Sequence, residues 1–310
     1  NYLTHFKTYS VFIKLHILYD RIIIILNSNL TISKVINVIN FEIYQNGKIK
    51  EYNNDIKLLI AEQNNTLFIF HGLYGRGKNW QSFAKKISQN EEILVFTVDL
   101  RNHGGNVFKE NMSYNLMMED IFHLFDYLGI EKTNLLGHSM GGKLAMLITL
   151  LRPHYVNNLI IADIAPINYP NDNQNIINAL FNLDLNLVRN RNHADELLSN
   201  EIEPKFLRSF LLQNIKLGDR KYKWTINLTA IKKAMNDLRS FPKIHKNKNV
   251  DTRSLCIYGQ KSDYVNENHF QIFKNFFSNV LFHEIQNAGH FLHIENPDEF
   301  YEVSKNFLKY

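Results

Sequence analysis

The feature that most limits how this chain can fold is a series of short, largely apolar runs separated by segments with helical spacing. The clearest runs are Thr66 to Phe70, Ile93 to Val98, Leu159 to Ile164 and Leu255 to Tyr258. Such runs are typical of strands buried on both faces, as in a parallel sheet covered by helices. The alternation therefore predicts an α/β fold with a mostly parallel central sheet and helices on both faces.

The length of 310 residues and the 45% hydrophobic content allow one large domain with a well-buried core. We predict this domain over residues 41–310, beginning with a hairpin around Asn46-Gly47. Residues from about 170 to 250 show helical spacing but no obvious sheet strand. This stretch predicts a helical lid inserted into the order of the sheet.

Residues 1–40 form a segment with few acidic side chains and no starting Met. They contain an apolar run, Ile22 to Leu26, but polar and charged residues before it (Lys14, His16, Asp20 and Arg21) interrupt anything close to the ~20 apolar residues of a membrane span, so we expect no transmembrane helix or stable membrane insertion. We interpret the segment as an N-terminal extension, either disordered or a targeting sequence. It carries a net charge of +3 of the +5 for the whole chain. Because no other basic run accompanies the motifs, nucleic acid is not an expected partner.

Cys256 is the only cysteine, so an internal disulfide cannot form. It lies within an apolar run, where a small buried core residue is the simplest interpretation. A reducing compartment fits this usage. We therefore expect a cytoplasmic location, or an organellar one if residues 1–40 are a targeting segment.

The strongest chemical signal is the sequence Gly-His-Ser-Met-Gly at residues 137–141, between an apolar run and a helical segment. A Gly-x-Ser-x-Gly pattern in this context predicts a sharp strand-to-helix turn that exposes the serine. A side chain at Gly137 or Gly141 would crowd that turn. The N-terminal end of the helix also favours negative charge that develops there. Ser139 is therefore the candidate nucleophile.

An oxyanion hole is predicted from a second motif, His71-Gly72-Leu73, at the end of an earlier apolar run. The tetrahedral intermediate of acyl transfer carries a negative oxygen, and each backbone N–H aimed at it contributes about 3 kcal/mol. We assign these donors to Leu73 and to Met140, the residue after the nucleophile. An ordinary turn is the alternative interpretation of a His-Gly pair at a strand end.

The candidate base is His290, in a loop near the C-terminus and after the last apolar run. A serine hydroxyl needs an imidazole to accept its proton, and the chain order serine, acid, histidine suits this fold. The other histidines near the motifs are expected to be structural or to line the pocket: His71, His103, His138 and His293.

Two aspartates could orient the imidazole, because both follow predicted strands at the edge of the sheet where the histidine loop lies. Asp163 ends one strand, and Asp263 follows the next strand along the chain. The residue pattern leaves both open.

Four segments together carry a specific resemblance: residues 71–80, 98–104, 137–143 and 163–166. Over roughly residues 60–310, the chain resembles the YbfF-type esterases of the α/β-hydrolase superfamily and their mitochondrial relatives. The combination is far more specific than any one of the motifs.

The resemblance implies the α/β-hydrolase fold with a Ser-His-Asp triad whose acid is Asp163, with Asp263 as the alternative. Ser262 stands at the usual acid position of the superfamily. Asp99 is expected to brace loops beside Arg101 rather than to take part in catalysis. The implied substrates are small to medium acyl esters, with thioesters as a further option.

These observations predict a carboxylic-ester hydrolase that acts through a serine acyl-enzyme and has a small-molecule ester as its partner. The chemistry requires no cofactor, and neither a metal motif such as His-Glu-x-x-His nor a phosphate-binding loop is present in the sequence. The alternatives are a thioesterase, a lactonase or a carbon–carbon bond hydrolase on the same fold, or a non-catalytic binding protein. The sequence carries no signal for the oligomeric state or the natural substrate.

Overall fold

The computed structural model describes residues 39–51, 56–63, 65–170, 174–219, 221–244 and 248–309. The pattern of contacts divides the chain into two units, residues 1–38 and residues 39–310, and we describe the second unit by itself. The extension predicted over residues 1–40 lies almost wholly outside the described residues. Its targeting role, and with it the organellar alternative, stays a prediction.

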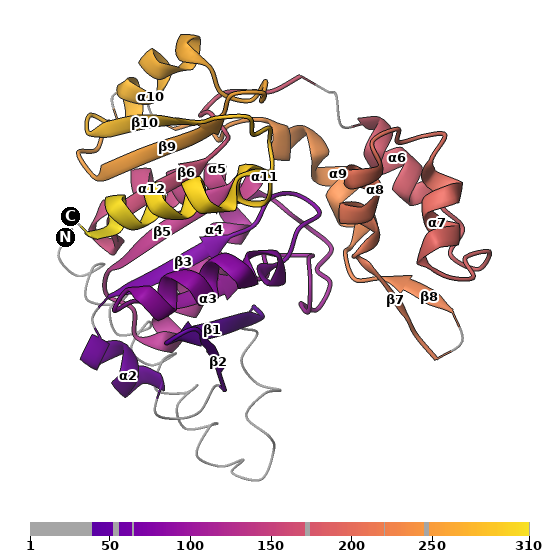
Figure 1. The fold of residues 1–310 in the computed structure, drawn as a ribbon, viewed down its shortest axis with the longest axis horizontal. Coiled ribbons are helices and arrows are strands. Elements are labelled where there is room, and N and C mark those ends of the chain that lie inside the picture. The colour runs from indigo at the N-terminus through magenta and orange to yellow at the C-terminus, as the bar shows by residue number, and fades with distance from the viewer. Residues whose placement is uncertain are drawn as a thin grey trace, which may run out of the picture. The chain divides into compact units, whose positions relative to one another are not determined.

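Eight strands of the described chain form one sheet, in the order β10, β9, β6, β5, β3, β4, β1, β2 (Figure 1). Their bounds are β1 Phe41–Gln45, β2 Lys48–Lys50, β3 Thr66–Phe70, β4 Leu94–Val98, β5 Thr133–His138, β6 Val156–Ala162, β9 Arg253–Gly259 and β10 Val280–Ile285. Neighbouring strands from β10 to β4 run parallel, and β1 runs antiparallel to β4 and β2. The predicted mostly parallel sheet is confirmed, and the predicted hairpin joins β1 to β2.

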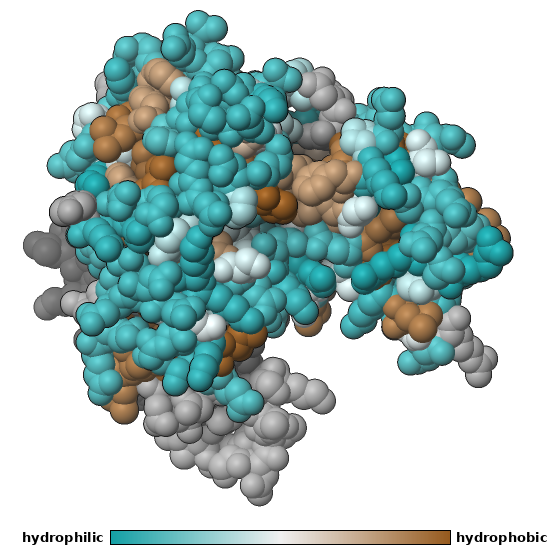
Figure 2. All heavy atoms as spheres, viewed as in Figure 1, coloured by the Kyte–Doolittle hydropathy of each residue, from teal (hydrophilic) through white to brown (hydrophobic). Residues whose placement is uncertain are grey.

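Helices cover both faces of this sheet (Figure 1). The α-helices of the described chain, including four in the segment between β6 and β9, are α2 Ile56–Gln63, α3 Gln81–Asn90, α4 Tyr114–Leu128, α5 Met140–Leu151, α6 Gln174–Asn182, α7 Arg191–Leu198, α8 Lys205–Leu212, α9 Leu228–Arg239, α10 Phe270–Phe276, α11 Leu292–Glu295 and α12 Pro297–Lys309. The face of the molecule shown in Figure 2 is mainly hydrophilic, including the surface over α3 and α12. Within the described residues, none of the helices is both long enough and apolar enough to cross a membrane.

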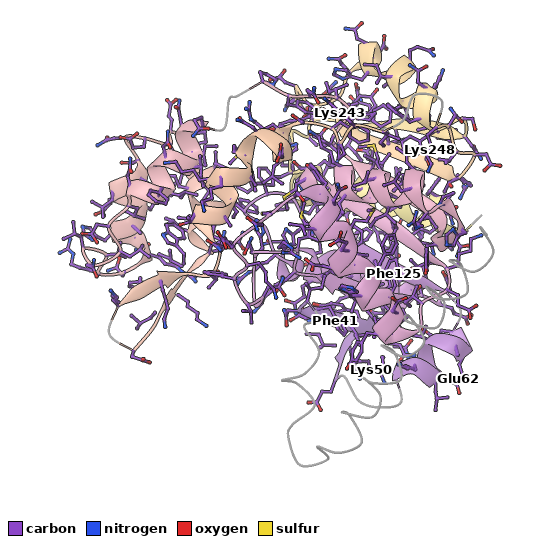
Figure 3. The ribbon with its side chains drawn as sticks, turned by 180° about the vertical axis from the view of Figure 1, so that it is seen from behind. Phe41, Lys50, Glu62, Phe125, Lys243 and Lys248 are labelled. Atoms are coloured by element: carbon purple, nitrogen blue, oxygen red, sulfur yellow. The ribbon has the colours of Figure 1, made fainter. Side chains whose placement is uncertain are left out.

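The side chains of β3 show how an apolar run becomes a central strand. Leu67 and Ile69 belong to the core cluster that includes residues of α3 and α12. Phe68 points the other way, where its ring stacks on Phe96 and meets Phe125 of α4 edge-on. Figure 3, drawn from behind, labels Phe125 on that opposite face. Because successive side chains of a strand alternate between faces, a strand that is apolar throughout requires helices on both sides.

The chain between β6 and β9 forms a separate structural part, which we call the inserted segment (residues 174–244). It holds α6, α7, α8 and α9, and also a small antiparallel pair, β7 (Ile215–Leu217) with β8 (Tyr222–Trp224). The residue pattern of this segment predicted no obvious strand. Each of these strands is three residues long and has a lysine at its centre, so neither contains the apolar run that marks the strands of the main sheet.

The buried carboxylate of Asp99, at the end of β4, ties together the loops near the edge of the sheet that carries the motifs. It accepts hydrogen bonds from the backbone N–H groups of Gly77 (2.7 Å) and Gly105 (2.8 Å) and from the Asn40 side chain (2.7 Å). Asp99 is 6% exposed. These contacts match the bracing role expected for Asp99, because they join segments that lie far apart in the sequence.

We expect Asp99→Ala to lower the free energy of unfolding by about 2 to 3 kcal/mol, because backbone N–H groups would lose their buried acceptor. Urea unfolding of the purified variant measures the change. The exposed residue Asp126 of α4 supplies a matched control, and Asp126→Ala should change the same free energy by less than about 0.5 kcal/mol. Equal free energies for the two variants would contradict this role.

Candidate active site

Ser139 lies at the turn between β5 and α5 in a strained backbone conformation, with φ 52° and ψ −117°. Its N–H donates to the carbonyl of Ala162 at 3.1 Å. A Cβ at Gly137 would lie 2.2 Å from the carbonyl oxygen of Gly141, and a Cβ at Gly141 would lie 2.3 Å from that of Phe70. Both glycines are therefore required by backbone atoms that cannot move aside, and the turn presents Ser139 at the start of α5.

Asp163 and His290 are brought together from opposite ends of the second half of the chain. The Nδ1 of His290 donates to the Oδ2 of Asp163 at 2.7 Å, and the Asp163 side chain is fully buried. The same carboxylate accepts from the hydroxyl of Ser262 at 2.5 Å and from the N–H of Gly259 at 3.2 Å. Three donors therefore hold this carboxylate, and the carboxylate fixes the ring orientation of His290.

Asp263, the alternative acid, is exposed and makes no hydrogen bond or ion pair with His290 in the described chain. Tyr264, the next residue, stacks its ring on the imidazole with a centroid distance of 3.9 Å and an angle of 18°. One face of the His290 ring is thus covered by an aromatic side chain, while Asp163 holds one edge.

A cavity of about 410 Å³ opens beside Ser139. Its lining residues come from both the body of the fold and the inserted segment: Leu73, Tyr114, Ser139, Met140, Lys143, Ile164, Tyr169, Pro170, Leu238, Arg239, Asp263 and Tyr264. The predicted oxyanion residues Leu73 and Met140 are both among them. Met140 is the first residue of α5, so its N–H has no carbonyl one turn earlier within the helix to bond.

His71 and His103 tie loops together as neutral imidazoles. The Nε2 of His71 accepts from the Leu100 N–H at 2.9 Å, and its Nδ1 donates to the Gly72 carbonyl at 2.8 Å. His103 likewise accepts from the Tyr74 N–H at 3.2 Å and donates to a backbone carbonyl. Burial lowers the pKa of both rings, that of His103 to about 3. Both rings therefore have a structural role, hydrogen-bonding the backbone of neighbouring loops, as the sequence led us to expect.

His138 connects the serine turn to the histidine loop. Its Nε2 donates to the His290 carbonyl at 2.8 Å, and the two ring centroids lie 4.6 Å apart. His293 stacks on Trp80 with a centroid distance of 4.0 Å, and burial lowers its pKa to about 3. Burial also lowers the pKa of His138, so neither residue carries a positive charge near neutral pH.

Two residues that contact the Asp163–His290 pair, Ser262 and Tyr264, were not predicted from the sequence to take part in the site. Ser262 was noted only as the occupant of the usual acid position, yet its hydroxyl bonds the carboxylate of Asp163. A hydroxyl placed where the superfamily carries its acid is a signal that could have indicated a partner for that acid. Tyr264 offers no comparable signal, because its stacking on His290 depends on how two distant loops meet.

In the part of the chain that the structure describes, no group of three or more His, Cys, Asp or Glu side chains is arranged to hold a metal ion. Cys256 is fully buried in β9, and burial raises the pKa of its thiol. This agrees with the interpretation of Cys256 as a core residue.

The alpha/beta hydrolase fold family matches residues 65–297 of the chain. The chain is 31% identical to the sn-1-specific diacylglycerol lipase ABHD11 of Mus musculus, over 78% of this chain and 80% of that protein. It is 28% identical to Esterase YbfF of Escherichia coli, over 79% of this chain and 93% of that protein. The resemblance to YbfF-type esterases that the motifs indicated is confirmed.

A solved structure described as a marine microorganism esterase superimposes with a TM-score of 0.78 at 32% identity, over 87% of this chain and 99% of that chain. The predicted fold class and the prediction of a hydrolase with esterase relatives are confirmed by these matches. The chain belongs to the alpha/beta hydrolase fold family.

Proposed function

We propose that the chain hydrolyses carboxylic esters through an acyl-enzyme formed on Ser139. The observation that carries this proposal is the 2.7 Å hydrogen bond between the buried carboxylate of Asp163 and His290. It fixes the imidazole in the tautomer whose Nε2 is free to accept a proton. His138, adjacent to Ser139 in sequence, bonds the backbone of His290 and so joins the two loops.

In the acylation step, Nε2 of His290 takes the proton of the Ser139 hydroxyl while Oγ attacks the ester carbonyl. The N–H groups of Leu73 and Met140 donate to the oxygen that becomes negative in the tetrahedral intermediate. Asp163 stabilises the imidazolium and keeps its own negative charge. The protonated His290 then gives its proton to the departing alcohol, and the ester bond breaks.

Deacylation repeats these steps with water as the nucleophile. His290 removes a proton from water, the resulting hydroxide attacks the acyl carbonyl, and the same two N–H groups bind the oxyanion. His290 then returns the proton to Ser139 and the carboxylic acid leaves. The cavity of about 410 Å³ suits a small to medium substrate, and relatives named esterases and lipases support ester bonds as the target.

We also propose that the inserted segment acts as a lid that selects substrates by size. Leu238 and Arg239 of α9 line the cavity, so this segment supplies part of the wall facing Ser139. The hydroxyl of Tyr114 donates to the Leu238 carbonyl at 2.7 Å, which holds that wall against the body.

Ser139→Ala should lower hydrolysis of a short p-nitrophenyl ester by at least about 10⁴-fold, because the attacking oxygen is lost. The measurement is turnover together with labelling by a fluorophosphonate probe. Ser199→Ala, at an exposed position of the inserted segment, is the control and should keep both. Undiminished turnover in a folded, pure Ser139→Ala preparation would refute the role of this serine.

Asp163→Asn should lower the turnover number by about 10⁴-fold, since the amide favours the wrong tautomer of His290. Asn also tolerates the positive φ of 51° at this position, so the backbone should be retained. Asp263→Asn is the matched control and should have little effect. Turnover and melting temperature are measured for both variants, and a large loss confined to Asp263→Asn would reverse the assignment.

Leu238→Ala should raise the rate ratio of long-chain to short-chain esters several-fold, because it enlarges the cavity. A panel of p-nitrophenyl esters of rising chain length measures this ratio. Leu217→Ala removes a leucine that is 64% exposed on β7 and should leave the ratio unchanged. The lid proposal fails if a folded Leu238→Ala variant has the wild-type chain-length profile.

A further inference from the structure

Lys143 is a buried cation in the wall of the cavity that the ester chemistry proposed above does not use. It is 2% exposed, and its Nζ donates to the carbonyl of Arg239 at 2.5 Å. The same ammonium lies 4.8 Å from the ring centre of Tyr169, and both neighbours line the cavity as well. A carbonyl and an aromatic face replace only part of the hydration that a buried ammonium loses.

Arg239 brings a second cation to the same wall. Its Nη2 donates to the Asn236 side chain at 2.7 Å, but its Nε is buried without a hydrogen-bond partner in the described chain. Among the described residues, no carboxylate forms an ion pair with Lys143 or with Arg239. Buried charges are ordinarily paired, and the buried Lys143 has no carboxylate partner among the described residues, whereas Arg239 is only partly buried. We call the part of the cavity wall formed by Lys143 and Arg239 the cationic end.

Three other titratable residues that line the cavity do not supply a negative partner: Tyr114, Tyr169 and Asp263. Tyr114 donates its hydroxyl proton to Leu238, and Tyr169 donates its own to the Tyr264 carbonyl. Burial raises the pKa of both phenols, so they stay neutral near pH 7. Asp263 also lines the cavity, but it is exposed on the loop after β9 and forms no ion pair with Lys143 or Arg239 in the described chain.

We propose that the cavity takes esters bearing a second, ionised carboxylate, which Lys143 and Arg239 bind while Ser139 attacks the ester carbonyl. Lys143 lies four residues after Ser139 in α5, one helical turn or about 6 Å along the axis. Because Ser139 and Lys143 also line the same cavity, we expect a carboxylate a few bonds from the ester to bind at the cationic end. This inference rests on the proposed ester hydrolysis and adds a substrate class to it.

If Lys143 binds the carboxylate, the preference for an anionic ester should depend on pH. Burial, together with the positive charge of Arg239, lowers the pKa of the Lys143 ammonium to about 7. In the free enzyme Lys143 is thus protonated below about pH 7 and loses its charge above it. Preference for an anionic ester over a neutral one, expressed as a ratio of kcat/KM values, should fall as the pH rises through this range. The contribution of His290 cancels in that ratio.

The test compares pairs of esters that match in shape and differ only in charge. Monoethyl glutarate and ethyl glutaramate carry the carboxylate or its amide on the acyl side. 4-Acetoxybutyrate and 4-acetoxybutanamide carry it on the alcohol side. The two pairs distinguish which half of the ester occupies the cationic end. Wild-type enzyme should favour the carboxylate member of at least one pair by about tenfold or more, the scale of a hydrogen bond to a charged group.

Lys143→Met should lower the carboxylate-to-amide ratio of that pair several-fold, because only Arg239 then remains to bind the carboxylate, and Lys143→Arg should restore most of the preference. Lys233→Met, at an exposed position on α9, removes the same charge from the surface and should keep the wild-type ratio. If Lys143→Met does not fold, inhibition of the wild type by free glutarate against glutaramide gives the same comparison without a variant.

The outcomes separate this proposal from the function on which it rests. Hydrolysis of the neutral amide esters without a preference for the carboxylate members overturns the anionic substrate class and leaves ester hydrolysis standing. A preference that is undiminished in Lys143→Met, or that does not fall above about pH 7, also overturns it. Failure to hydrolyse any ester of either pair contradicts the proposed function, and the substrate class falls with it.

Discussion

The buried carboxylate of Asp163 is the interaction on which the rest of the site depends. It lies just after β6, and it holds the ring of His290, the hydroxyl of Ser262 and the N–H of Gly259 at the end of β9. Because β6 and β9 are parallel neighbours, their carboxyl ends meet at one edge of the sheet. A fully buried charge is tolerated there because donors surround it.

Burial lowers the pKa of two kinds of base in the site, the histidines and Lys143, but their partners differ. His71, His103, His138 and His293 have lowered pKa values, and the neutral forms of the first three are satisfied by backbone hydrogen bonds. Lys143 is also buried, yet its partners are a carbonyl and an aromatic ring, which solvate a cation only in part. The histidines therefore stiffen the loops, whereas Lys143 leaves an unmet preference for an anion in the cavity.

Local patterns in the sequence predicted the parts of the site that a single turn or strand end determines. Ser139 is recognisable because the glycines around it are needed at a turn where backbone atoms crowd. The choice between Asp163 and Asp263 is different, because both follow strands that end at the same edge. The positive φ of Asp163 and the packing of the histidine loop decide which carboxylate meets His290, and neither follows from residue spacing. Whether Lys143 forms an ion pair also depends on tertiary packing, and among the described residues it forms none.

In the proposed reaction Ser139 carries the acyl group, and trapping this acyl-enzyme is the decisive experiment. Wild-type protein is mixed with a slowly released p-nitrophenyl ester, quenched in acid within the first turnover, digested and mapped by mass spectrometry. If Ser139 is acylated, we expect an acyl mass increment on the peptide that contains Ser139, together with a stoichiometric burst of p-nitrophenol. An increment on a different residue, or steady turnover with neither burst nor adduct, would contradict it.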